Sequence, residues 1–304
     1  MLIAIDHGNK QMKLPEGRAF TSGLRESDTR PPFGDDILYY KGKYYTLSEK
    51  RIPYMRDKTA DDRFYILTLF AIAFEIERVG NFLTGMIPIR LLVGLPPAHF
   101  GAQYERFENY FKRGIEEFEF HGKTFKIDIR DVTAFPQAFA AAMPVYGRIS
   151  AMPRAIVIDI GGFTADYLLI KNGQPDLSVC DTLEHGVIIM YNQIAARVNS
   201  ELDLLMDESD IDAVLKGESH DFGDNVKRIV NDMAQVFISD LIGKLRERAI
   251  DLRSGRAVFV GGGSILLKKQ IEDSGKVVSP IFVDKISANA KGYELLYRAS
   301  RTRG

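Results

Sequence analysis

The hydrophobic pattern of the chain contains the same local unit twice. Residues 2–5 are all apolar and end at Asp6, and residues 155–158 form a similar run that ends just before Asp159. Each aspartate is followed two positions later by a glycine, and further apolar positions follow each turn. Because an unbroken apolar run is typical of a strand buried on both faces, each unit predicts a strand, a glycine turn and a second strand. The two aspartates lie 153 positions apart (159 minus 6) in a chain of 304, which indicates an internal duplication.

Further patterns place other elements along the chain. Thr59, three positions before Asp62, resembles a capping box and predicts a helix over 59–78. The stretch 131–147 predicts a strand that passes through Pro136 into a helix of small residues, with the proline in its first turn. Other expected elements are a buried strand at 89–97, a hairpin around residues 121–122, helices at 186–203 and 223–250, a strand, glycine turn and helix at 257–273, and a final helix at 287–300.

Composition and charge narrow the classes of function. The chain has 40 basic and 41 acidic side chains, so no net field favours direct binding of nucleic acid. Its only cysteine excludes an intramolecular disulfide, and no apolar run is long enough to cross a bilayer, so we expect no membrane association. Asp6 interrupts the N-terminal apolar run before it could form a signal-peptide core. We therefore expect a two-lobed cytoplasmic protein.

The glycine turns indicate phosphate binding. A turn without Cβ atoms lets backbone N–H groups converge on phosphate oxygens, and two such turns would hold a polyphosphate from both sides. Lys13 adds a positive charge to the first turn, and Thr164 adds a hydroxyl to the second. Asp6 and Asp159 suit Mg²⁺, which keeps most of its waters and takes few carboxylates, so we expect them to bind it through water.

A third glycine-rich segment follows a predicted strand near the C-terminus. Gly261, Gly262 and Gly263 precede Ser264 at the expected start of a helix, where a flat group could lie against bare backbone. The P-loop pattern of phosphate-binding proteins is absent from the sequence. These glycines therefore favour a different class of nucleotide-binding fold.

These segments, in order, resemble the motifs of the actin, sugar-kinase and DnaK superfamily. The segments are "LIAIDHGNKQMKL", "DVTAFPQAFAAA", "AIVIDIGGFTADYLLI", "VFVGGGSILL" and "ANAKGYELLYR". Within that superfamily, "TFKIDIRDVTAFPQAFAA", "LLVGLPPAHF" and "EHGVIIMYNQI" are similar to the ParM-type bacterial actins that segregate plasmids. The resemblance implies an α/β, two-lobed actin-like fold of two duplicated ribonuclease-H-like domains around a nucleotide cleft. We place domain I at 1–146 with helix 288–304, and domain II at 147–287.

The resemblance also assigns site residues. Those implied to bind the nucleotide are Asp6, Gly8, Asn9, Lys13, Gly161, Gly162, Thr164, Gly261, Gly262, Gly263 and Ser264. Asn9 departs from the hydroxyl residue usual in the first turn of the family. Asp159 and Gln137 are the implied catalytic residues, and Gln137 stands where the family orients the attacking water. ParM itself has a glutamate at that position and actin has a glutamine, so the departure from ParM bears on the rate of hydrolysis.

The function implied is that of a filament-forming ATPase that binds ATP and Mg²⁺ and segregates plasmid DNA through a ParR-type DNA-binding adaptor. GTP remains an alternative nucleotide. A small-molecule kinase of the same superfold is a competing hypothesis, although it needs a carboxylate base where Gln137 stands. A DnaK-type chaperone would need a substrate-binding domain, and a shape-related or phage-related actin would differ only in cargo.

Overall fold

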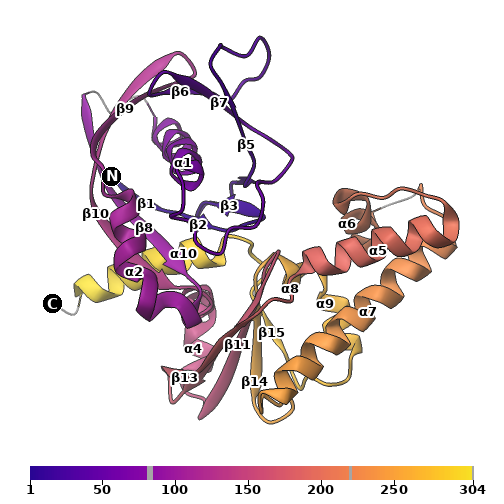
Figure 1. The fold of residues 1–304 in the computed structure, drawn as a ribbon. Helices are drawn as coiled ribbons and strands as arrows, with labels where there is room; N and C mark the ends of the chain where they lie inside the picture. Colours follow the sequence, from indigo (N-terminus) through magenta and orange to yellow (C-terminus); the bar gives the residue numbers. More distant parts are fainter. Residues whose placement is uncertain (81–84, 219–220, 303–304) are drawn as a thin grey trace. The chain divides into compact units, whose positions relative to one another are not determined.

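The computed structural model describes residues 1–80, 85–218 and 221–302, and the chain divides into two compact units. Unit 1 comprises Met1–Ala140 and Ser287–Gly304, and unit 2 comprises Ala141–Ile286. The final helix therefore packs with the N-terminal residues of the sequence (Figure 1).

The main sheet of unit 1 has seven strands in the order β1-β8-β10-β9-β6-β7-β5. Their bounds are Leu2–Ala4 for β1, Met86–Leu95 for β8, Lys123–Pro136 for β10, Gly114–Phe120 for β9, Ile37–Tyr40 for β6, Lys43–Leu47 for β7 and Leu24–Ser27 for β5. The strands β1, β8 and β10 run parallel, and the other neighbours pair antiparallel. Because parallel strands end at one edge, side chains that follow β1 and β10 are brought together there.

A three-stranded antiparallel sheet continues from β1. It consists of β2 (Asp6–His7), β3 (Gln11–Lys13) and β4 (Ala19–Thr21). The N–H of Ile5 donates to the carbonyl of Leu92 at 2.9 Å, so the path of β1 beside β8 continues into β2. This arrangement is the strand, turn and second strand that the sequence predicts.

The long helix α1 (Arg63–Val79) fills the inside of the unit 1 sheet (Figure 1). All its residues from Phe64 to Ile76 are buried, as the nearly continuous apolar pattern predicts. The predicted capping box at Thr59 is wrong: its hydroxyl donates to Asp57, at 2.6 Å, and the helix begins four residues later. No helix in the described ranges is long and apolar enough to span a membrane.

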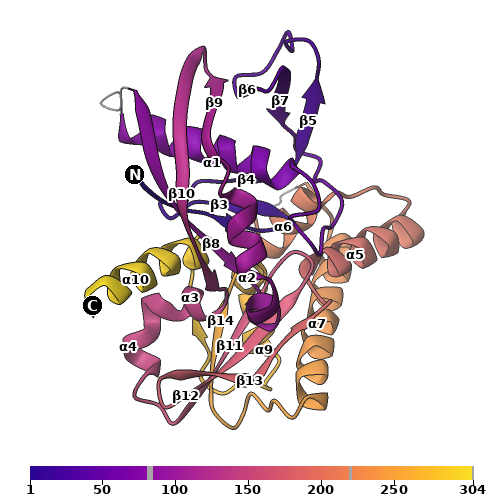
Figure 2. The same cartoon turned by 60° about the vertical axis from the view of Figure 1, so that its left-hand side comes forward.

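Two more helices complete unit 1: α2 (Pro97–Phe111) and α10 (Ala288–Thr302). Helix α10 lies against β8 and β1 (Figure 2). Its approach is close, because a Cβ on Gly292 would lie 1.9 Å from the carbonyl oxygen of Ala140. The ring of Tyr293 covers Gly94 of β8, where a Cβ would lie 2.0 Å from the tyrosine oxygen. Glycine at both contact points thus allows α10 to pack closely against α3 (Phe139–Ala142) and against β8.

The predicted helix that begins at Pro136 is broken in the structure. Pro136 is the last residue of β10 and does not lie in the first helical turn. The following segment forms three short pieces: α3 (Phe139–Ala142), a 3-10 helix (Met143–Val145) and α4 (Tyr146–Ile149). The physical reason for the late start is the left-handed conformation of Ala138, with φ of 58°, which is incompatible with a continuing helix.

Unit 2 contains a five-stranded sheet in the order β13-β12-β11-β14-β15. The bounds are Gln174–Leu183 for β13, Ala165–Lys171 for β12, Arg154–Ile160 for β11, Arg256–Val260 for β14 and Ile281–Phe282 for β15. Its helices are α5 (Val187–Leu202), α6 (Glu208–Lys216), α7 (Asp224–Glu247), α8 (Gly262–Leu266) and α9 (Lys268–Asp273). The sequence pattern predicts no helix between residues 203 and 223, where the structure contains α6.

The two units share a topology. In unit 2, an antiparallel meander β11-β12-β13 is followed by β14 and β15, which run parallel to β11. In unit 1, the path β1-β2, then β3 and β4, forms the same meander, and β8 and β10 run parallel to β1. The duplication inferred from Asp6 and Asp159 therefore extends to the strand order of both units.

The close contact of α10 generates a stability prediction. We expect Gly292→Ala to lower the free energy of unfolding by about 1–3 kcal/mol, because the added methyl group would overlap the backbone of Ala140. The matched change Gly243→Ala, in α7, meets no atom within 4 Å and should raise stability by up to ~1 kcal/mol. Urea unfolding of both variants tests the contact, and an equal effect of the two changes would contradict it.

Candidate functional site

The first turn is organised around the buried carboxylate of Asp6, which is 2% exposed. Lys13, its register partner on β3, places its ammonium 3.2 Å from Oδ2. The amide Nε2 of Gln137, at the end of β10, donates to Oδ1 at 2.8 Å. Three residues that the sequence assigned to the site are thus brought together, and both oxygens of the aspartate have partners.

The backbone of the first turn is tight. A Cβ on Gly8 would lie 2.5 Å from the carbonyl oxygen of Gln11, so only glycine fits there. The hydroxyl of Ser22 donates to the carbonyl of Gly8 at 2.5 Å. The side-chain oxygen of Asn9 accepts from the backbone N–H of Met55 at 3.1 Å. Asn9 therefore ties the turn to a neighbouring loop through its side chain.

His7 anchors the turn on its inner side. The ring is fully buried and lies 4.9 Å, centroid to centroid, from the ring of Phe111. Its Nε2 lies 2.9 Å from the hydroxyl of Thr68, which itself donates to a backbone carbonyl on α1, so Nε2 is the donor of this pair. Burial, together with the nearby ammonium of Lys58, lowers the pKa of His7 to about 3. The imidazole is therefore neutral at physiological pH.

The second turn is held by the start of α5. The N–H of Gly161 donates to the carbonyl of Thr164, which closes the turn at 2.8 Å. The carbonyls of residues 161, 162 and 163 accept from the N–H groups of residues 187, 188 and 186, at 2.9–3.1 Å. Because the first N–H groups of a helix have no partner inside it, the turn supplies the acceptors that α5 requires. In the described part of the chain, the N–H groups of Gly162 and Thr164 donate to no protein acceptor.

The end of β14 brings the third glycine segment beside Asp159. Gly261 has φ of 87°, and a Cβ there would lie 2.2 Å from Oδ1 of Asp159, so only glycine fits. A Cβ on Gly263 would lie 2.5 Å from the side chain of Ile160. A Cβ on Gly262, by contrast, would meet no protein atom within 4 Å. The hydroxyl oxygen of Ser264 is buried without a hydrogen-bond partner in the described residues.

Asp166 supports the second turn from β12. Its Oδ2 accepts from the hydroxyl of Thr164 at 3.3 Å, and its Oδ1 accepts from the hydroxyl of Thr182 at 2.5 Å. Both oxygens of the carboxylate are therefore used within the protein. This geometry agrees with a structural role for Asp166.

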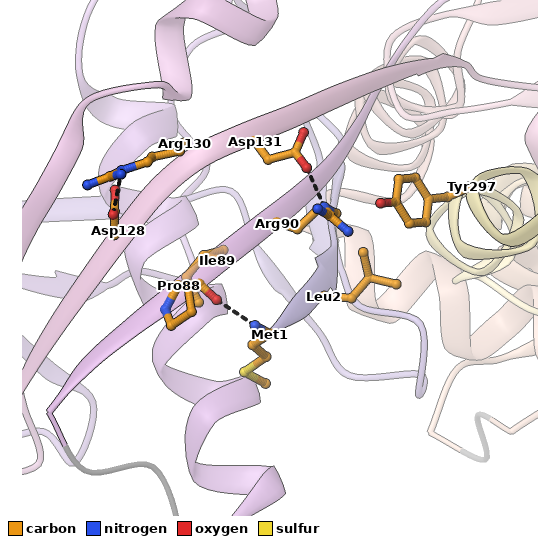
Figure 3. A pocket seen from close by; sticks show the side chains of 9 residues that line it. All are labelled: Met1, Leu2, Pro88, Ile89, Arg90, Asp128, Arg130, Asp131 and Tyr297. Carbon is orange, nitrogen blue, oxygen red and sulfur yellow. Dashed lines mark hydrogen bonds and ion pairs between the residues drawn. The ribbon is translucent and has the colours of Figure 1, made fainter. Parts of the chain in front are cut away.

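A separate cavity of about 440 Å³ lies in unit 1 at the opposite end of the same parallel strands (Figure 3). A bulge in β10 between Ile129 and Asp131 breaks the alternation of side chains. It turns Asp131 toward Arg90 of β8, while Arg130 pairs with Asp128 at 2.6 Å. Two carboxylates thus neutralise two guanidinium groups, and the cavity does not present the concentrated positive charge expected of a polyphosphate site.

The site residues fall into two sets, one in each unit. Unit 1 gathers the turn at 6–13 and Gln137, and unit 2 gathers Asp159, the turn at 161–164 and the segment 261–264. Asp6 and Asp159, the predicted magnesium ligands, therefore belong to different units. Within the described ranges, no cluster of three or more His, Cys, Asp or Glu side chains could hold a metal by direct ligation alone.

Two protein-family models match the chain in succession. The N-terminal domain of actin-like proteins matches residues 4–139, and the C-terminal part of the archaeal MreB-like actin homologue matches residues 157–273. The chain is an actin-like protein. No curated protein matches its sequence. The family models cover both copies of the strand and glycine turn described above.

Solved structures confirm the predicted actin-like fold. The archaeal actin homolog Ta0583 in complex with ADP is 18% identical, with a TM-score of 0.74 over 100% of this chain and 99% of that one. A ParM subunit from a 15-stranded filament of Clostridium botulinum is 19% identical, with a TM-score of 0.74 over 98% and 99%. Bacillus thuringiensis ParM with ATP is 13% identical, with a TM-score of 0.70 over 99% of both chains. The resemblance of this actin-like protein to the ParM type is thereby supported at the level of the fold.

Two residues that shape the site of this actin-like protein are not among those that the sequence assigns to it. The five histidines of the sequence show no metal-ligand spacing that would mark His7, yet its ring anchors the first turn. Gly186 packs so closely that a Cβ would lie 2.3 Å from the carbonyl oxygen of Gly162. Its place at the start of the helix predicted over 186–203 is the sequence signal that could have indicated this role.

The lowered pKa of His7 predicts acid sensitivity. Because the folded-state pKa of about 3 lies below the ordinary value of 6.5, the unfolded chain binds the proton more tightly. The contribution of His7 to the free energy of unfolding has its full value above pH 6.5. Between pH 6.5 and pH 3 this contribution falls by about 1.4 kcal/mol for each unit by which the pH drops.

We expect His7→Gln, which keeps a side-chain donor for Thr68, to show a shallower loss of stability between pH 7 and pH 5 in urea unfolding. His185 also has a pKa lowered by burial, and it is present in both proteins, so its contribution cancels in the comparison. An unchanged pH slope in the variant would contradict the account of His7.

Proposed function

We propose that this actin-like protein is an ATPase that binds ATP with Mg²⁺ and assembles into filaments that turn over as the nucleotide is hydrolysed. The observation that carries the proposal is the repetition of a buried aspartate and a tight glycine turn at the end of the first strand of each unit. The match of both regions to actin-like family models supports it.

In this proposal, the two turns hold the phosphates. Gly8 and Lys13 contribute backbone and charge from domain I, and Asn9 shapes that turn through Met55. From domain II, the N–H groups of Gly162 and Thr164 fit phosphate oxygens, because they have no acceptor in the described protein. Gly161 closes this turn. We take domain I as 1–146 with 288–304, and domain II as 147–287.

The third glycine segment suits the nucleoside part of the ligand. Gly262 presents bare backbone with open space where a side chain would stand. Gly261 and Gly263 allow the chain to pass close to Asp159 and Ile160. The buried hydroxyl of Ser264 has no partner in the described residues, as expected of a group that meets a ligand. Adenine is the base we propose, with guanine as the alternative.

The donor set fits a magnesium ion held largely by water and phosphate. Asp6 and Asp159 are both buried carboxylates, at 2% and 8% exposure, and carboxylate oxygens are the protein groups that Mg²⁺ prefers. Mg²⁺ commonly takes only one or two protein carboxylates and keeps several waters. When bound, it would supply charge neutralisation for the phosphates, and Lys13 would add its ammonium charge.

Gln137 is the residue we propose to position the attacking water. Its Nε2 donates to Asp6, which fixes the amide plane and leaves the carbonyl oxygen to accept a hydrogen bond from water. An amide cannot remove a proton, so its contribution is orientation. The same point separates the proposal from a small-molecule kinase, which requires a carboxylate base at this place.

For the biological role, we propose plasmid segregation in the cytoplasm, with ATP-bound subunits joining filaments and hydrolysis loosening them. The similarity in fold to a ParM filament subunit supports self-assembly. The balance of 40 basic and 41 acidic residues favours coupling to DNA through a ParR-type adaptor protein over direct binding.

The role of Gln137 predicts the behaviour of a variant. We expect wild-type protein to scatter light and form filaments visible by electron microscopy when ATP and Mg²⁺ are added. Gln137→Ala should still assemble, and it should release phosphate more slowly by a factor of up to about ten. Its filaments should therefore persist longer than those of the wild type.

Gln103→Ala, at a half-buried position of α2, provides the matched control and should behave as the wild type. If the wild-type protein binds ATP and does not assemble at any concentration tried, the filament proposal is wrong. Phosphate release should then be compared with and without added hydroxyl acceptors.

The open space at Gly262 gives a sharper test of the nucleotide site. We expect Gly262→Val to leave the unfolding free energy nearly unchanged, because no protein atom lies within 4 Å of the new Cβ. ATP binding should weaken by at least about tenfold, since the side chain would cover the backbone offered to the nucleotide.

Gly101→Val is the matched control, because Gly101 is a helical glycine with the same open surroundings in unit 1. Fluorescence titration with a labelled ATP analogue measures both affinities. Equal affinity in the two variants would contradict the assignment of Gly262.

A further inference from the structure

The residue after Gln137 adopts an unusual backbone conformation. Ala138 has φ of 58°, in the left-handed region that favours glycine, although it is fully buried and carries a Cβ. The N–H of Phe139 donates back to the carbonyl of Gln137 at 2.5 Å, so Ala138 is the centre of a three-residue turn. Such turns with a positive φ are rare and strained, and they persist only when the surroundings hold them.

Asn289 of α10 supplies that support. Its side-chain oxygen accepts from the N–H of Ala138 at 3.1 Å, and the asparagine is 6% exposed. The bond joins residues 151 positions apart in the sequence. The helix that carries Asn289 is itself fixed, because Gly292 packs against the carbonyl of Ala140 and Tyr293 covers Gly94.

Gln137 is therefore held from both sides. On the sheet side, its N–H donates to the carbonyl of Leu95 at 2.8 Å, which continues the pairing of β10 with β8. On the other side stands the strained turn that Asn289 caps. Between these two restraints, the side chain of Gln137 reaches Asp6.

We propose that Asn289 is a positioning residue for hydrolysis: it holds the turn at Ala138 so that the amide of Gln137 is aimed at Asp6 and the attacking water. This inference rests on the role proposed above for Gln137. Asn289 touches neither nucleotide nor water in this scheme. Without its oxygen, the N–H of Ala138 loses its acceptor and the turn can relax toward the right-handed region, which rotates the peptide that carries Gln137.

The main test compares three variants in steady-state phosphate release. Asn289→Ala should lower kcat by about tenfold and leave the KM for ATP nearly unchanged, because only orientation is lost. Asn289→Asp keeps an acceptor for Ala138 and should recover most of the kcat. Ser287→Ala removes another buried side-chain hydrogen bond just before the same helix, to the carbonyl of Pro15, and should leave kcat unchanged.

Hydrogen exchange gives a readout that does not depend on catalysis. The amide of Ala138 should exchange slowly in the wild-type protein and in Ser287→Ala, and faster in Asn289→Ala. Glycine adopts this φ without strain, so in an Ala138→Gly background Asn289→Ala should lower kcat less than it does in the wild type.

The outcomes separate this inference from the proposed function. If the wild-type protein binds no nucleotide or releases no phosphate, the proposed function fails. If the wild type hydrolyses ATP and Asn289→Ala keeps the kcat of Ser287→Ala, only the positioning role fails. A second result would also overturn the positioning role. In it, Asn289→Ala and Asn289→Asp lower kcat equally, and hydrogen exchange at the amide of Ala138 is the same as in the wild type.

Discussion

A carboxylate buried at the end of the first strand constrains the whole of the first turn. Asp6 is 2% exposed, and a buried charge without partners would be costly. The hairpin brings Lys13 to one oxygen, and the end of β10 brings Gln137 to the other. The sheet order β1-β8-β10 is what places that strand end within reach. The same contacts that satisfy the buried charge also define the orientation of the glutamine amide.

Unit 2 repeats the topology and stabilises its turn by different means. No lysine corresponds to Lys13 in the turn at 161–164, and the turn is instead fixed by the first N–H groups of α5. Asp159 lies against Gly261, where a side chain could not be accommodated. Duplicated sheets therefore support two turns with distinct chemistry, one with a fixed positive charge and one with backbone donors.

The sequence predicted most of the strands and the positions of both turns, because apolar runs and glycines are local signals. It predicted poorly where a distant or unusual contact decides the conformation. Helix α1 begins later than the predicted start at Thr59, because the hydroxyl of Thr59 donates a hydrogen bond to Asp57 and does not cap the helix. The helix expected from Pro136 is broken because Ala138 is left-handed, and nothing in an alanine reveals the sign of φ. The partner that holds this conformation, Asn289, lies 151 positions away.

Isothermal titration calorimetry of the wild-type protein with ATP measures directly whether the chain carries the nucleotide site proposed for it. Below the concentration at which filaments form, we expect saturable binding of one ATP per chain, with an affinity that falls when a chelator removes Mg²⁺. Saturable binding of GTP in place of ATP would identify GTP as the nucleotide and would still support the proposed site. Folded protein that binds neither nucleotide, with or without Mg²⁺, would contradict the account.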